Sequence, residues 1–298
     1  GISFTDEKLT DVAVTQSRAV IMNANYEVID EIDYLATGEG ITEYHSIESH
    51  DFVMLGLNHY LICGYVGANV TNIPTEVDDD GSAYVTACIV QEVIDGELIF
   101  QWDSTDFPEL YGYSTECNDY DADTPQDYAH LNSVDIDPVD GNIIMSFRQL
   151  DALLKVDRET GDIIWILGGI GDQFGLTDEQ LFSHQHHAKF SDDGILTFYD
   201  NGNAYEQTRV VQVILDEENM TISEYIAYGT ERKYTWYMGS AMCLDQDAGL
   251  YLMGWGGRTE DGAIFSEINY VTGETLFELY DMDTGYENSS YRVYKFDS

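Results

Sequence analysis

The chain has 298 residues, 44% of them hydrophobic, which is enough for one large domain with a full core. It carries 56 acidic and 12 basic residues and a formal net charge of −44, which excludes nucleic acid and anionic membrane surfaces as partners. No apolar run reaches about 18 residues, so we expect no insertion into a membrane.

Strand patterns follow one another along the whole chain. It has 26 Gly and 22 Tyr but 4 Pro, and short runs of Val, Ile, Thr and Tyr alternate with turns, which favours an all-β fold. Two strands are predicted first, at residues 18–22 and 26–32. Four units then cover about residues 50–281, and each reads strand, turn, strand, loop, strand, turn, strand. Asp140-Gly141 and Asp193-Gly194 are hairpin-turn signals inside two of these units.

The spacing of the units favours a β-propeller. The unit recurs about every 60 residues, the length of a four-stranded blade with generous loops and longer than the repeats of a two-sheet sandwich. A last strand is predicted over residues 291–296. We expect it to pair with the N-terminal strands at residues 18–32, because ring closure removes exposed sheet edges. The sequence therefore predicts a single domain over residues 1–298, a six-bladed propeller with five blades as the alternative.

Histidine recurs at one position of the predicted unit, the start of its first strand. In a propeller the innermost strand lines the channel, and one of its ends opens at the mouth. Arg148 and Arg209 lie near these histidine motifs, and a guanidinium can bind an oxyanion through two parallel hydrogen bonds. A common mouth built in this way favours a small anionic substrate. The histidines expected to reach it are His50, His130, His186 and His187.

The four cysteines do not form a metal-binding pattern. None of Cys63, Cys88, Cys117 and Cys243 belongs to a C-x-x-C motif, so a zinc site is not expected. Cys63 and Cys88 fall in adjacent strand patterns, and two readings stay open for them, a disulfide or two buried free thiols.

Calcium is the one cofactor that the sequence suggests, and none is required by the predicted chemistry. The acidic segment around residues 118–123 offers hard oxygen ligands, with Asp119, Asp121 and Asp123 as the candidates, although it lacks the full twelve-residue calcium loop. Three N-x-S/T triplets indicate a glycoprotein located outside the cytoplasm, extracellular or periplasmic; they begin at Asn69, Asn219 and Asn288.

Several short segments together resemble the arylsulfotransferase family over about residues 50–296. The family's catalytic domain is a six-bladed β-propeller, and its bacterial members are secreted or periplasmic. The resemblance implies an enzyme that moves a sulfuryl group from one phenolic compound to another through a sulfohistidine, so its partner would be a small aryl sulfate or phenolic ligand. The segments are residues 130–135, Gly141-Asn142, residues 146–148, residues 157–161 with Trp165, Gly168-Gly169, residues 185–188 and residues 200–202.

The resemblance implies that His130 and His186 are catalytic and that Arg209 belongs to the sulfate pocket. The family's nucleophilic histidine is expected near residues 237–240, and no histidine follows His187 in this chain. Four alternatives therefore stay open: His187 or His50 is the nucleophile, transfer is direct, or the chain is an inactive secreted binding or structural propeller. We assign substrate binding to His50, Asn132, Arg148, His187 and Asn201.

Overall fold

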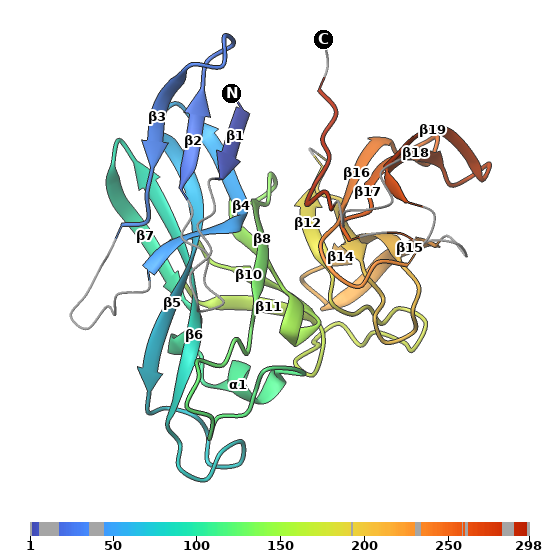
Figure 1. Cartoon of the computed structure of the whole chain (residues 1–298). Helices are drawn as coiled ribbons and strands as arrows, with labels where there is room; N and C mark the ends of the chain where they lie inside the picture. The colour runs from blue at the N-terminus through green and yellow to red at the C-terminus, as the bar shows by residue number, and fades with distance from the viewer. Residues whose placement is uncertain are drawn as a thin grey trace. The chain divides into compact units, whose positions relative to one another are not determined.

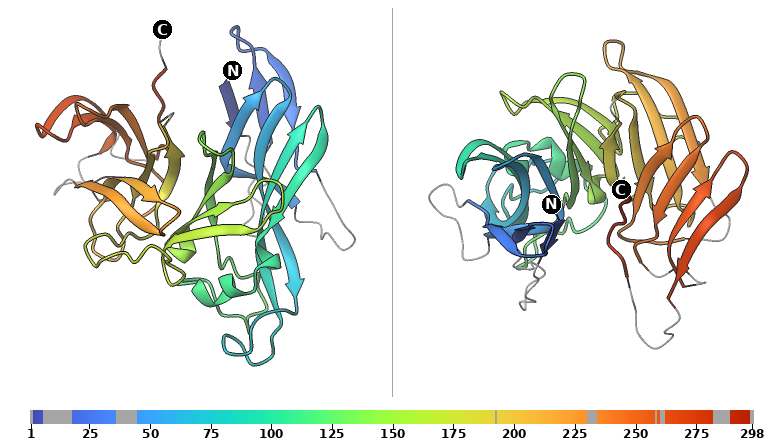
Figure 2. Two further views of the ribbon diagram at one scale, coloured as in Figure 1. Left: turned by 180° about the vertical axis from the view of Figure 1, so that it is seen from behind. Right: turned by 90° about the horizontal axis from the view of Figure 1, so that it is seen from above.

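The computed structural model describes residues 2–5, 18–35, 45–191, 193–229, 234–257, 259, 262–281 and 289–296 (Figure 1). These residues form nineteen strands in five sheets and one short α-helix, so the predicted all-β class is confirmed. In every sheet the strands lie in chain order, each beside its neighbour in the sequence (Figures 1 and 2). This is the strand order that the repeating units predicted.

Residues 2–103 supply two sheets. The first has three strands and the second has four long ones, and apolar side chains of both sheets, among them Ile21, Ile32, Ile62 and Ile89, form one core. The short helix α1 (Glu109–Tyr113) follows. The strands are β1 (Ile2–Thr5), β2 (Ala19–Met22), β3 (Val28–Ile32), β4 (His45–Gly56), β5 (His59–Val70), β6 (Ala83–Ile94) and β7 (Glu97–Asp103).

Three four-stranded sheets follow, and aromatic and aliphatic side chains pack between successive sheets. Trp165 of the third sheet packs with Phe198 of the fourth, and Tyr199 of the fourth packs with Trp255, which follows β17 in the fifth. The strands are β8 (Leu131–Ile136), β9 (Ile143–Phe147), β10 (Ala152–Val156), β11 (Ile163–Gly168), β12 (His186–Phe190), β13 (Leu196–Asp200), β14 (Arg209–Asp216), β15 (Thr221–Gly229), β16 (Ser240–Asp245), β17 (Leu250–Gly254), β18 (Ala263–Asn269) and β19 (Glu274–Tyr280).

The predicted hairpin turns lie where glycine is needed. Gly141 has a φ of 81° and Gly194 a φ of 76°, a left-handed conformation that glycine adopts without the steric cost of a Cβ atom. Each of these turns joins the first two strands of a four-stranded sheet. The sequence pattern of blade-like units is therefore confirmed at this level, while the number of blades and ring closure stay predictions.

The chain divides into two compact units by its internal contacts. The first comprises Gly1–Val134 and Asp157–Asp162, and the second comprises Asp135–Val156 and Ile163–Ser298. The single domain expected from the sequence stays a prediction.

The C-terminal segment departs from expectation. The predicted strand over residues 291–296 is wrong, because the described part of this segment has no strand assignment. Its backbone is held by other groups of the second unit: the Ser290 N–H donates to the Gly256 carbonyl (3.1 Å), the Gly239 N–H donates to the Tyr291 carbonyl (3.2 Å) and the Val293 N–H donates to Ser240 Oγ (3.0 Å). Among the described residues, the first sheet is made of β1, β2 and β3 alone.

The cysteines and the helices complete the fold. None of the four cysteines is in a disulfide, and Cys63 and Cys88 are buried, so of the two readings for this pair the structure has the buried thiols. Within the described ranges, no helix has the length and hydropathy needed to cross a membrane.

Candidate functional site

The structure distributes the predicted site residues over the two units. The first unit holds His50, His130 and Asn132. The second holds the remaining predicted residues of the anion pocket: Arg148, His186, His187, Asn201 and Arg209. The common mouth expected for His130 and His186 therefore stays a prediction, and each group has its own geometry.

His50 and His130 form a histidine pair in the first unit. His50 lies in β4, where the register with β5 is irregular between Ile47 and Phe52, and His130 directly precedes β8. Their rings meet edge to face, with centroids 4.9 Å apart. The Val134 N–H donates to Asp51 Oδ2 (2.9 Å), which ties β8 to the part of β4 that carries His50. The structure thus brings together two of the histidines predicted from their repeat positions.

A carboxylate holds each ring of this pair through Nδ1. His50 Nδ1 contacts Glu48 Oε2, which also accepts the His50 backbone N–H at 2.7 Å. His130 Nδ1 lies 2.5 Å from Asp127 Oδ2. Because an ionised carboxylate only accepts hydrogen bonds, Nδ1 carries the hydrogen in each ring, and the lone pair of the neutral imidazole is on Nε2.

Sequence reasoning missed Glu48 and Asp127, which lie two and three residues before their histidines. Their spacing is a usable signal for Glu48, because residues i and i+2 of a strand share one face. Asp127 lies outside a strand, in a segment with several acids, so the sequence pattern does not single it out.

Two further reactive side chains lie beside the pair. The Tyr65 ring is 5.8 Å from that of His130, and its hydroxyl donates to the Leu131 carbonyl at 2.8 Å. Cys88 Sγ accepts the Leu131 N–H at 3.4 Å. Burial, with the nearby charge of Asp127 as the next cause, raises the pKa of the Cys88 thiol well above its usual value. Cys88 is therefore a protonated thiol at neutral pH.

His186 is fixed by a hydrogen-bond network in the second unit. Its Nδ1 lies 2.8 Å from Asn201 Oδ1 and 2.9 Å from the His184 carbonyl. Asn201 Nδ2 donates to the carbonyls of Thr235 (2.8 Å) and Met238 (2.9 Å), which sets the orientation of the amide. Since both contacts of Nδ1 are acceptors, Nδ1 carries the hydrogen and the lone pair is again on Nε2. The structure thus brings together His186 and Asn201, both assigned to the site from the sequence, and their roles stay predictions.

His187, its neighbour, is held through both ring nitrogens. Nδ1 lies 3.1 Å from the Ala241 carbonyl, and Nε2 lies 3.3 Å from the Tyr294 hydroxyl. The residue is 2% exposed. These contacts join β12 to β16 and to the C-terminal segment.

Arg209 is engaged by protein acceptors. Its Nε and Nη2 lie 2.8 and 2.6 Å from Oδ2 of Asp200, its cross-strand partner between β13 and β14. Nη2 also donates to the Leu181 carbonyl at 2.5 Å and contacts the Tyr205 hydroxyl. Burial, the largest cause, raises the pKa of the Asp200 carboxyl, and Arg209 opposes that effect. Sulfate binding by Arg209 stays a prediction, and it would require the guanidinium to give up some of these bonds.

The remaining candidates have local partners or stay untested. Arg148 lies in a 3₁₀ turn (Arg148–Leu150), where its Nη1 donates to Gln149 Oε1 at 2.6 Å, and Asn132 is buried in β8. Calcium binding at Asp119, Asp121 and Asp123 stays a prediction: across the described ranges, no three His, Cys, Asp or Glu side chains are grouped so that they could hold a metal ion.

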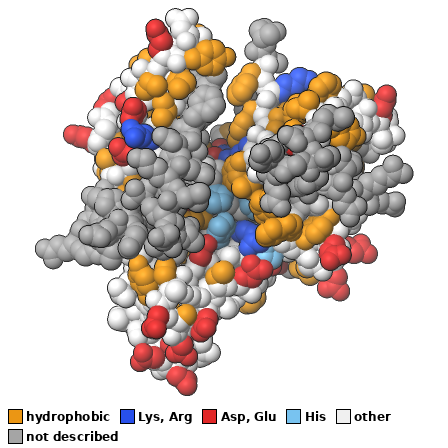
Figure 3. Space-filling model, viewed as in Figure 1, with side chains coloured by type: hydrophobic (Ala, Val, Ile, Leu, Met, Phe, Trp, Pro, Cys, Tyr) orange, Lys and Arg blue, Asp and Glu red, His pale blue; other side chains and the backbone are white. Residues whose placement is uncertain are grey.

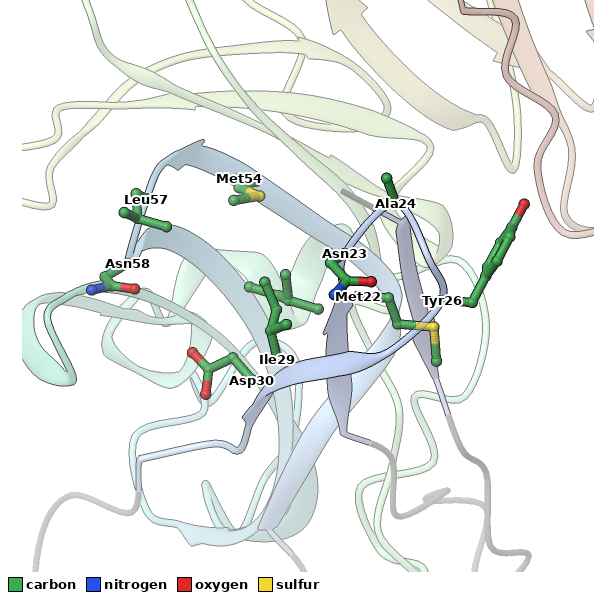
Figure 4. A pocket seen from close by; sticks show the side chains of 10 residues that line it. Met22, Asn23, Ala24, Tyr26, Ile29, Asp30, Met54, Leu57 and Asn58 are labelled. Atoms are coloured by element: carbon green, nitrogen blue, oxygen red, sulfur yellow. The ribbon is translucent and has the colours of Figure 1, made fainter.

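Surface and cavity features add to this picture. Figure 3 shows acidic side chains spread over one face and histidine atoms that reach its surface. The first unit also has an open apolar cavity of about 510 Å³ between the β2–β3 and β4–β5 hairpin ends, lined by Met22, Tyr26, Ile29, Met54 and Leu57 among others (Figure 4). None of the predicted site residues lines this cavity.

One backbone feature recurs before three of the four-stranded sheets, and one of its residues lies in the segment 237–240, where the nucleophilic histidine was expected. His130, His184 and Met238 each lie one or two residues before the first strand of a four-stranded sheet, and each has a left-handed φ of 56° to 58°. Histidine is among the residues that adopt this conformation more often than most. Met238 therefore shares a left-handed backbone conformation, close to the start of the first strand of its sheet, with His130 and His184.

Comparisons with known proteins give a family. A family model described as Arylsulfotransferase (ASST) matches residues 13–292. Arylsulfate sulfotransferase AssT of Escherichia coli O6:H1 (strain CFT073) is 25% identical over an alignment of 198 residues, and the match covers 52% of this chain and 33% of that protein. The match thus spans about a third of the length of this curated relative.

Two solved structures align at low similarity. A protein of unknown function from Bacteroides caccae aligns with a TM-score of 0.42 and 13% identity, covering 89% of this chain and 90% of that one. The Dos1 propeller aligns with a TM-score of 0.37 and 12% identity, covering 90% of this chain and 67% of that one.

Proposed function

This chain belongs to the arylsulfotransferase (ASST) family, and from that membership we propose that it moves a sulfuryl group from an aryl sulfate to a phenolic acceptor. The observation that carries the proposal is the family match over residues 13–292, which includes all the histidine positions described above. The substrates proposed are small aryl sulfates and phenols, and the proposed location is extracellular or periplasmic.

The chemistry of this transfer suits the oriented histidines. When the bond between sulfur and the phenolic oxygen breaks, the leaving oxygen gains charge and needs a proton, and the oxygens of the sulfuryl group need hydrogen-bond donors. His130 and His186 each have Nδ1 hydrogen-bonded to an oxygen of the protein. We propose that each uses Nε2 to deliver or accept a proton or to hold a sulfuryl oxygen.

A simple assay tests the activity. The wild-type protein, incubated with 4-nitrophenyl sulfate and phenol, should release nitrophenol, and His186→Ala should lower turnover by about 10² to 10⁴-fold, the usual contribution of a general acid or base. His59→Gln is a matched control, because His59 contacts Glu92 in an ion pair with Arg158 and is not part of the proposed site. If His186→Ala turns over at the wild-type rate, His186 is not part of the mechanism.

A second candidate function is a binding protein without activity. The specific observation in its favour is Met238, whose thioether cannot carry a sulfuryl group as a histidine does. In that case aryl sulfates would raise the melting temperature of the wild-type protein, as any ligand of the native state does, without release of nitrophenol.

A further inference from the structure

The proposed transfer through a sulfohistidine needs a nucleophile that a substrate can reach. Met238 cannot serve, and the four candidate histidines differ in accessibility. His186 and His187 are each 2% exposed. The side chains of His50 and His130 are 18% and 21% exposed. The histidine pair of the first unit is therefore the more accessible set.

We propose that His50 receives the sulfuryl group on Nε2 and that His130 is its acid–base partner, an inference that rests on the proposed function. The two rings are distinguished by their carboxylates. Glu48 has a side chain only 7% exposed and accepts both the backbone N–H and the ring of His50, whereas the side chain of Asp127 is 29% exposed. A desolvated carboxylate on Nδ1 orients an imidazole and raises the basicity of its other nitrogen, as in the Asp–His pairs of hydrolases.

The neighbouring groups do not compete for this role. The thiol of Cys88 is protonated because burial raises its pKa, and a thiol is a far weaker nucleophile than a thiolate. The Tyr65 hydroxyl is committed to the Leu131 carbonyl. Compared with the Cys88 thiol and the Tyr65 hydroxyl, an imidazole of the pair is thus the better placed nucleophile for attack on sulfur at neutral pH.

The step balances with these residues alone. His130 acts as the imidazolium, with a hydrogen on both Nδ1 and Nε2, and His50 acts as the neutral imidazole. The lone pair on Nε2 of His50 forms a bond to sulfur, the bond between sulfur and the aryl oxygen breaks, and the leaving oxygen takes the Nε2 proton of His130, which becomes neutral. In the second half, neutral His130 takes the proton of the acceptor phenol, whose oxygen attacks sulfur while the bond to His50 breaks. Both histidines return to their starting protonation states, and the 4.9 Å separation of the ring centroids lets both reach one substrate.

The test is to find the sulfurylated residue. The wild-type protein is mixed with 4-nitrophenyl sulfate and no acceptor, quenched in alkali and digested, and peptides that gain the mass of one SO₃ are sequenced by mass spectrometry. We expect a burst of nitrophenol equal to the enzyme present and the label on His50. His50→Ala should lose burst and label, His130→Asn should slow the burst by about 10² to 10⁴-fold, and His59→Gln should keep both.

Each other outcome overturns the assignment and says why. A label on His130, His186 or His187 places the nucleophile elsewhere while the proposed function stands. If the wild-type protein turns over steadily without any label and His50→Ala turns over at the same rate, the transfer is direct. Absence of nitrophenol release from the wild-type protein overturns both the proposed function and the role of His50. Mapping the label needs only the wild-type protein, so a variant that folds poorly does not block the answer.

Discussion

Alanine at Arg209 is expected to destabilise the second unit by about 3–5 kcal/mol, because it leaves the Asp200 carboxylate buried without its counter-charge. The Asp200 side chain is 0% exposed, and Arg209 contacts it through two nitrogens. The corresponding fall in melting temperature is roughly 6–20 °C. Thermal unfolding followed by circular dichroism measures it. Arg18→Ala is the control: Arg18 pairs with Glu31 at the surface, where an ion pair contributes at most about 1 kcal/mol.

The pH dependence of Arg209→Ala identifies the cause. Burial already raises the pKa of Asp200 above its usual value, and loss of Arg209 removes the charge that opposes this rise. A carboxyl with a higher pKa in the folded than in the unfolded state binds protons preferentially when folded, so it favours folding at low pH and loses that effect as pH rises through the folded pKa. The difference in stability from wild type should therefore shrink as pH falls toward about 4. An unchanged melting temperature with lost turnover would instead support the sulfate-pocket role of Arg209.

The fold class followed from periodicity because the signals are local. Strand patterns and turn glycines such as Gly141 and Gly194 act over a few residues, and they gave the four-stranded sheets in their chain order. The C-terminal segment shows the limit. Residues 291–296 alternate like a strand, but the backbone groups of Tyr291 and Val293 bond to Gly239 and Ser240, and only the tertiary arrangement brings these groups within reach.

The sequence pointed to the histidines of the candidate site but not to the side chains that hold them. Repeat position pointed to His50 and His130, and the structure pairs them. The choice of Glu48 and Asp127 among 56 acidic residues depends on side-chain directions that the sequence does not specify. The sequence does hold a signal for the Asp200–Arg209 pair, since Asp200 ends β13, Arg209 begins β14, and the two residues pair across this hairpin.

Lys155 is expected to be as important for stability as Arg209. It is 1% exposed in β10, and its ammonium lies 2.7 Å from oxygens of Asp137, Asp140 and Glu217. Burial alone would lower the pKa of Lys155, but the hydrogen bonds to these carboxylates outweigh it and raise the pKa. The same contact lowers the pKa of Asp140 against the effect of burial. The lysine thus replaces water as the partner of several acids in a chain of charge −44.

Lys155→Met should destabilise the second unit by about 3–5 kcal/mol at neutral pH, because Asp137, whose side chain is 5% exposed, loses its cation. Because the pKa of Asp140 is lowered, its contribution to the free energy of unfolding is present above the unfolded pKa and is lost as pH falls through the folded pKa. The difference in stability between Lys155→Met and the wild-type protein should therefore narrow in acid.

The double variant Lys155→Met with Asp137→Asn should recover part of the lost stability, since no buried charge is then unpaired. Lys295→Ala is the control, because Lys295 is 54% exposed in its pair with Glu267 and should change stability by less than about 1 kcal/mol. Chemical denaturation at two pH values measures all three variants, and a Lys155→Met protein as stable as the Lys295→Ala protein would show that the acids around Lys155 are stabilised without it.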